Sequence, residues 1–249
     1  MKHKLIILIA ILANIFAISA QENDEKTAAE LYAAKDYSAA KVVYENLLEK
    51  GESADLFYNY ANVCYKLDEL GAAILYYEKA LKINPLHADA KANLEFVNTK
   101  ITDKIETFQP FFLTEWINSL GQSLTSNQWA FLSIGLFLLA VVLAMFFLFF
   151  SYRKVRKISF FAAIFMLIFA IFSFFYAFSQ KKYTENNPYA IVLQGSVSVK
   201  SSPADSGTEL FLLHEGTKIE VLSTLGSWTE IKLSDGKNGW VLSDVMAQI

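Results

Sequence analysis

The residues of this sequence that could do covalent chemistry are few and lie far apart. The chain has one cysteine, Cys64, and three histidines, at positions 3, 87 and 214. A nucleophile needs a neighbouring base, and a zinc site needs three or four ligands at short spacing. The sequence contains neither pattern and has no glycine-rich phosphate loop. We therefore expect no enzyme, no cofactor and no metal. We expect Cys64 to be a packed core thiol rather than a nucleophile, and a single cysteine excludes an internal disulfide framework.

The most distinctive stretches are two long apolar segments. Residues 128–150 and 158–178 contain no charged residue. As helices they would be about 34 and 31 Å long, and a bilayer core is about 30 Å thick. The alternative is a buried helical hairpin in a soluble protein. It is disfavoured because the phenylalanines around residues 146–150 and 160–161 leave no polar face for water. The sequence thus predicts two transmembrane helices.

A basic turn at 151–157 sets the predicted orientation. It holds Arg153, Lys154, Arg156 and Lys157, and such cations stay on the cytoplasmic side. Residues 21–127 and 179–249 carry net charges of −7 and −2 and would lie outside. Neither span contains an aspartate, glutamate, lysine, arginine or histidine, which argues against a transporter.

The N-terminus predicts a signal peptide over residues 1–20. A short cationic start precedes an apolar run, and small residues from Ala17 to Ala20 follow. We expect cleavage near residue 19 or 20, with an uncleaved anchor as the alternative. In either case the segment that follows would be exported.

Residues 21–105 are predicted to be helical and repetitive. Three pairs of similar residues are 33 positions apart, namely Ala40 and Ala73, Tyr44 and Tyr77, and Leu48 and Leu81. Small Ala61 lets the two helices of a repeat approach closely, and Pro85 ends the second helix. With these residues and this spacing, the segment resembles tetratricopeptide repeats. That resemblance implies a groove for partner segments, lined here by Tyr58, Asn62, Tyr65 and Lys66. The alternative for these four residues is an ordinary solvated helix face.

A connector over residues 106–127 mixes aromatic and polar residues. We expect Thr114 to Ser123 to form a short helix on the outer membrane surface, and Ser126 or Asn127 to cap the first span. The alternative is a linker packed on the repeats.

After a polar linker at 179–187, the pattern of residues 188–249 changes to period 2. It predicts a small barrel of five to seven strands, with a hairpin turn at Asp235-Gly236. The segment resembles bacterial SH3 domains through Val197-Ser-Val199, Gly226-Ser-Trp228 and Gly239-Trp240, with Lys200 where the family usually has arginine. Members of that family bind cell-wall peptides or protein segments, or act as spacers. Tyr189, Trp228 and Trp240 could offer an aromatic groove, although core or rim packing is the alternative for Trp240.

The predicted fold class is therefore multidomain: an all-α helical repeat, a transmembrane helical hairpin and a small all-β SH3-like barrel. This order of parts resembles the BatE-like family of the Bacteroides aerotolerance operon. The resemblance implies a bacterial inner-membrane protein whose partners are Bat proteins with von Willebrand factor A domains. The resemblance does not define a molecular activity. The predicted order of parts and the orientation set by the basic turn favour a non-enzymatic scaffold with both soluble parts in the periplasm. The alternative is a cell-wall tether whose barrel binds peptidoglycan, and nothing in the charge pattern suggests nucleic acid.

Overall fold

The computed structural model describes residues 24–104, 112–121, 123–185 and 187–249, so the predicted signal peptide lies outside the described residues. The described residues belong to two compact units. The first contains residues 24–82, 87–104 and 188–249, and the second contains residues 83–86 and the helices between 112 and 185.

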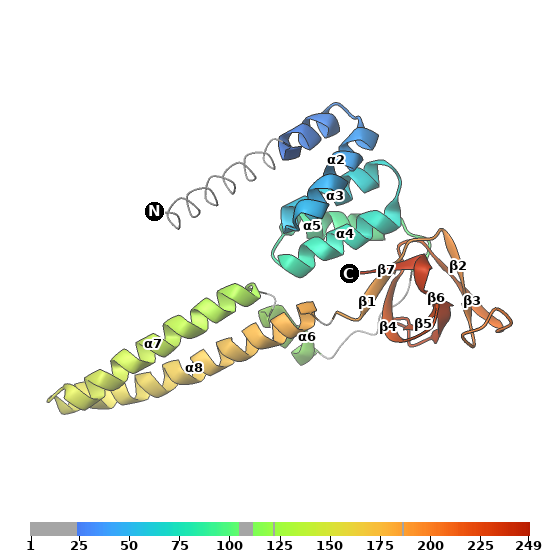
Figure 1. Cartoon of the computed structure of the whole chain (residues 1–249). Coiled ribbons are helices and arrows are strands. Elements are labelled where there is room, and N and C mark those ends of the chain that lie inside the picture. The colour runs from blue at the N-terminus through green and yellow to red at the C-terminus, as the bar shows by residue number, and fades with distance from the viewer. Residues whose placement is uncertain (1–23, 105–111, 122, 186) are drawn as a thin grey trace, which may run out of the picture. The chain divides into compact units, whose positions relative to one another are not determined.

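The first unit begins with a run of short helices (Figure 1). Residues 24–33 are helical and are followed by α2 (Tyr37–Lys50), α3 (Ala54–Lys66), α4 (Leu70–Ile83) and α5 (Ala88–Asn98). Side-chain caps start three of them: Asp36 accepts from the Ala39 N–H and Ser53 from the Leu56 N–H, both at 3.1 Å. His87 Nδ1 accepts from the Ala90 N–H at 3.2 Å at the start of α5. Such caps satisfy backbone donors that the first turn leaves unpaired.

The helices enclose one apolar core, in which equivalent positions of the predicted repeats have the same burial. Ala40 and Ala73 are fully buried, and Tyr44 and Tyr77 are almost so. Cys64 is completely buried in the same core, as expected. Burial raises the pKa of its thiol to about 12, which removes the reactive thiolate at neutral pH.

The C-terminal part, here called the β domain (residues 188–249), is a curled antiparallel sheet. Its strands are β1 (Tyr189–Val192), β2 (Ser196–Lys200), β3 (Glu209–His214), β4 (Lys218–Leu225), β5 (Trp228–Lys232), β6 (Asn238–Leu242) and β7 (Met246–Gln248), in the order β3-β2-β6-β5-β4-β1-β7. Inward side chains of these strands form a second core. The predicted turn is confirmed, because Gly236 joins β5 to β6 with φ +88°, a conformation that suits glycine.

The β domain and the helices share buried side chains, which no local pattern in the sequence indicates. Ile191 and Ile249 of the β domain are buried in the helical core. The turn between β3 and β4 also approaches the helices: a Cβ added at Gly216 would lie 2.6 Å from Ile101 Cγ2 and 2.9 Å from Ile74 Cδ1. The two parts are therefore one folded body, although the whole helical hairpin separates them in the sequence.

Polar contacts complete this helix–β junction. Glu215 Oε1 accepts from the Gly71 N–H at 2.7 Å, placing a carboxylate at the positive end of α4. Asp103 accepts from the His214 N–H and the Thr217 hydroxyl, each at 2.7 Å, and lies 2.8 Å from His214 Nδ1. A Lys218–Glu78 ion pair at 2.7 Å links β4 to α4. These bonds fix the orientation of the β domain on the helices.

The second unit contains α6 (Phe112–Gly121), α7 (Ser126–Phe149) and α8 (Arg153–Glu185). Two helices, Ser126–Phe149 and Arg153–Lys182, are long and apolar enough to cross a membrane. Three boundaries differ from the expectation. The short helix predicted from Thr114 to Ser123 is α6, which starts and ends two residues earlier. The residue that caps α7 is Thr125 rather than Ser126 or Asn127, and Thr125 and Gln128 bond each other's backbone N–H groups. The predicted turn 151–157 shortens to residues 150–152, because no glycine or proline prevents α8 from starting at Arg153.

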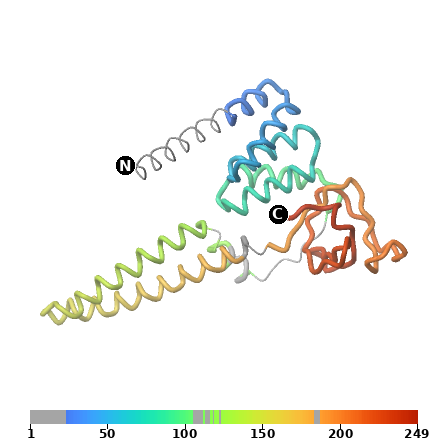
Figure 2. Tube along the Cα trace, viewed as in Figure 1, coloured from blue at the N-terminus to red at the C-terminus, as the bar shows by residue number. Residues whose placement is uncertain are grey.

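Small residues form the seam between α7 and α8, which run side by side in opposite directions (Figures 1 and 2). The buried seam residues are Ser133 and Ala140 on α7 and Ser159, Ala170, Ser173 and Ala177 on α8. The Ser133 hydroxyl donates to the Ala170 carbonyl at 2.9 Å. Small side chains allow two helices to approach closely, and most of the phenylalanines of α7 and α8 are exposed.

Candidate binding surfaces

An aromatic face lies on the outer side of the β domain, across β5, β6 and β2. We define it by Trp228, Trp240, Lys200, Glu230 and Leu242. Trp228 is paired with Leu242, and Trp240 is paired with both Glu230 and Lys200. Directly opposite residues share a sheet face, so the two indoles are diagonal neighbours. The Lys200 ammonium lies 5.6 Å from the Trp228 ring centre, within the range of a cation–π contact.

The indoles of this aromatic face are half-buried, and their neighbours along the strands point into the core. Thr229, Ile231 and Val241 are buried, as the alternation of a half-buried strand requires. Trp240 is thus on the outer face rather than in the core. A face with two indoles and a lysine can stack on a planar or apolar group and pair with a carboxylate.

The structure does not bring Tyr189 to these two tryptophans. It lies on β1, which β4 separates from β5. Its ring packs against the helical core, and the Lys218 ammonium lies 5.1 Å from its centre. Tyr189 therefore belongs to the helix–β junction.

The four residues predicted to line a helical groove lie together on α3, and α5 packs against them. Asn62 Oδ1 accepts from the Asn93 amide at 2.9 Å and also from the Tyr77 hydroxyl. Tyr58 lies 4.8 Å from the His87 ring, and Tyr65 lies 5.9 Å from Phe96. The Lys66 ammonium is over the Tyr65 ring at 5.8 Å and remains exposed. Part of this face is used in helix packing, and its half-buried tyrosines and Lys66 remain accessible.

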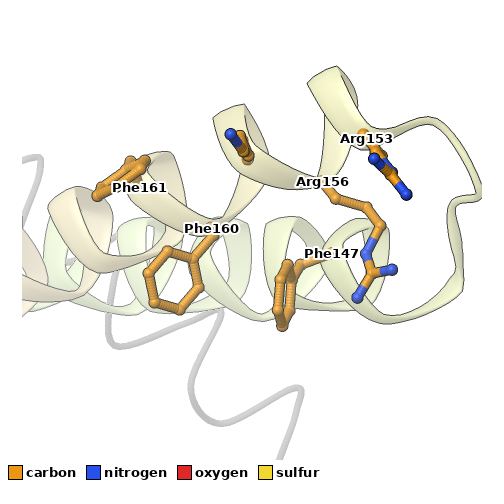
Figure 3. A pocket seen from close by; sticks show the side chains of 6 residues that line it. Phe147, Arg153, Arg156, Phe160 and Phe161 are labelled. Carbon is orange, nitrogen blue, oxygen red and sulfur yellow. The ribbon is translucent and has the colours of Figure 1, made fainter.

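The four cations predicted to set the topology lie in the first two turns of α8. Arg153, Lys154, Arg156 and Lys157 are all exposed. Three of them line a cavity of about 310 Å³ together with phenylalanines of both helices (Figure 3). The Arg156 side chain reaches from α8 to the Phe147 ring on α7, with 5.3 Å between its guanidinium carbon and the ring centre.

The junction residues Asp103, His214 and Glu215 carried no signal in the sequence. They lie more than 100 positions from their partners across the junction, in loops or at element ends. Glu230 and Leu242 could have been found, because the period-2 pattern places them on the same face as the predicted Trp228 and Trp240.

One comparison with known families identifies the C-terminal part. Residues 195–247 match the model of the bacterial SH3 domain family. The match includes Lys200, Trp228 and Trp240 but not Tyr189. No curated protein matches the chain. The β domain is therefore a bacterial SH3 domain, joined in this chain to a helical region and two long apolar helices.

Proposed function

We propose that the chain is a non-enzymatic scaffold of a bacterial inner membrane. In this proposal α7 and α8 cross the bilayer, and the helical region acts as a tetratricopeptide-like repeat. That region and the SH3 domain would bind protein partners together on the periplasmic side. The partner class implied by the BatE-like resemblance is a Bat-type protein with a von Willebrand factor A domain.

The shared core of the helices and the SH3 domain carries this proposal. Ile191 and Ile249 can pack among the helices only if both parts lie on the same side of the membrane. Between the two parts the chain has two candidate spans, an even number that returns it to the starting side. The four cations of α8 lie at the bend of the hairpin, which supports a cytoplasmic bend.

Two further observations support binding to proteins. The equal burial of Ala40 and Ala73, and of Tyr44 and Tyr77, supports a repeat architecture, and such repeats present surfaces to partner segments. The aromatic face adds two half-exposed indoles, a residue type that is enriched among interface residues with large binding energies.

Affinity purification of the full-length protein from membranes tests this proposal. We expect the wild type to retain a membrane or periplasmic partner. Trp228→Ala should weaken binding about 30-fold, because a central interface tryptophan contributes about 2 kcal/mol. Leu193→Ala, which also removes an exposed apolar side chain from the SH3 domain, is the matched control. Purification without such a partner, or equal retention by Trp228→Ala and wild type, would contradict the proposal.

The cell-wall tether is the second candidate, because the aromatic face places a lysine beside an indole in a bacterial SH3 domain. Peptidoglycan stem peptides carry carboxylates and would pair with Lys200. The test is sedimentation of the detergent-solubilised full-length protein with purified sacculi. Retention that Trp228→Ala or Lys200→Ala abolishes would support a tether, and no retention of the wild type would exclude it.

A further inference from the structure

A cavity that mixes cations and aromatic rings lies near the bend between α7 and α8. Phe147 of α7 and Phe160 of α8 form part of its wall, with ring centres 5.2 Å apart (Figure 3). Phe161 contacts Phe160 at 5.5 Å, and Arg153, Arg156 and Lys157 complete the lining. The cavity therefore has an apolar part and a cationic part.

Arg156 lies beside the Phe147 ring, and 5.3 Å separate its guanidinium carbon from the ring centre. A guanidinium has five N–H donors, and their fork geometry matches the oxygen atoms of a phosphate. Arg156 can therefore contact the apolar wall and bind an anion with the same side chain.

The sequence of the hairpin contains no acidic residue near these cations. Residues 116–184 contain no aspartate or glutamate. Among the described residues, no ion pair involves Arg153, Lys154, Arg156 or Lys157. A helix N-terminus already carries about half a positive charge, so cations in the first turns of α8 repel it. An external anion would relieve this repulsion.

We propose that this cavity binds an anionic phospholipid. The phosphodiester would accept hydrogen bonds from Arg153, Arg156 and Lys157, and the start of an acyl chain would lie along Phe147, Phe160 and Phe161. A lipid fits better than a free anion because the phenylalanines add an apolar wall that continues into the exposed aliphatic and aromatic surface of α7 and α8. The inference rests on the proposed membrane insertion of the hairpin, since only there does the cavity meet lipid headgroups.

Lipid titration of the full-length protein in detergent, followed by native mass spectrometry, tests the proposal. We expect one phosphatidylglycerol to bind in preference to phosphatidylcholine. Arg153→Gln with Arg156→Gln should weaken that first binding step by about fivefold for each cation removed. Arg153→Lys with Arg156→Lys keeps the charge but loses the paired donors of the planar guanidinium, and should also weaken binding.

The matched control is Lys181→Gln with Lys182→Gln, which removes two exposed cations from the other end of α8. It should leave the first lipid-binding step unchanged. An equal loss of lipid binding in this control would overturn the proposed site. Lipid binding as tight as that of the wild type, in either double variant of Arg153 and Arg156, would also overturn it. Extraction of membranes at alkaline pH is done first: release of the protein would contradict the proposed function itself, whereas retention without lipid preference contradicts only this inference.

Discussion

Replacing Gly216 by alanine tests whether the helices and the SH3 domain form one folded body. Gly216 lies in the turn between β3 and β4 with φ +88°. An alanine Cβ there would approach Ile101 Cγ2 to 2.6 Å and Ile74 Cδ1 to 2.9 Å, both from the helical region. Ile74 is almost completely buried, so it has little room to move.

Two costs add in Gly216→Ala. A non-glycine residue with positive φ costs about 1–2 kcal/mol. Overpacking against the two isoleucines adds about 1–3 kcal/mol. The matched control is Gly236→Ala, because Gly236 also has φ +88° but a Cβ there would meet no atom within 4 Å. The control therefore has only the backbone cost. The two variants should differ in free energy of unfolding by about 2 kcal/mol, which is the cost of overpacking between the SH3 domain and the helices.

Thermal unfolding of the two purified full-length variants gives this difference. About 2 kcal/mol corresponds to a Tm about 4–8 °C lower for Gly216→Ala than for Gly236→Ala in a body of this size. Hydrogen exchange should also increase at the N-terminus of α4 and around Asp103, where the SH3 domain contacts the helices. Equal Tm values, together with unchanged exchange in the helices, would show that Gly216 does not pack against the helical region.

Three other residues give further predictions. Burial alone would raise the pKa of Asp103, but hydrogen bonds from His214 and Thr217 outweigh burial and hold that pKa below its usual value. Its carboxylate therefore stabilises the fold above the unfolded pKa of about 3.9, and this stabilisation is lost as pH falls through the lower folded pKa. Asp103→Asn should therefore lower the free energy of unfolding at neutral pH. In urea unfolding at a series of pH values, the variant should also lose less stability than the wild type as the pH is lowered. Ser133→Leu should separate α7 from α8 and lower the Tm of the protein in detergent by more than Ile134→Leu does, because Ser133 is in the buried seam and Ile134 is exposed. Cys64 should resist iodoacetamide at pH 8 until the protein is unfolded, since burial raises its pKa to about 12, and labelling of the folded protein would contradict its place in the core.

Local patterns in the sequence predicted most of the elements. The apolar runs gave both long helices, and the period-2 pattern around Trp228 and Trp240 gave the outer face of the SH3 domain. The regular spacing of similar residues placed Ala40 and Ala73 correctly in the helical core. These features depend on residue types that recur at a fixed spacing along the chain, which is why a sequence can reveal them.

Contacts between distant segments could not be predicted in this way. Tyr189 was grouped with the two tryptophans because all three are aromatic, but β1 packs its ring against the helices. Asp103 and Glu215 are ordinary acidic residues in the sequence, and their roles depend on His214 and Gly71 being brought to them by the fold. The packing of α5 against Tyr58 and Tyr65, two of the residues predicted to line a groove, likewise has no local signature in the sequence.

The most direct test of the central claim is the accessibility of single cysteines to a membrane-impermeant maleimide in cells with a permeabilised outer membrane. Buried Cys64 gives little background, and Lys66→Cys, Lys237→Cys and Ser151→Cys place exposed thiols in the helical region, the SH3 domain and the bend. While the inner membrane is intact, we expect positions 66 and 237 to be labelled, and we expect position 151 to be labelled only after lysis. Labelling of position 151 before lysis, or of only one of the other two positions, would contradict a single folded body on one side of the membrane.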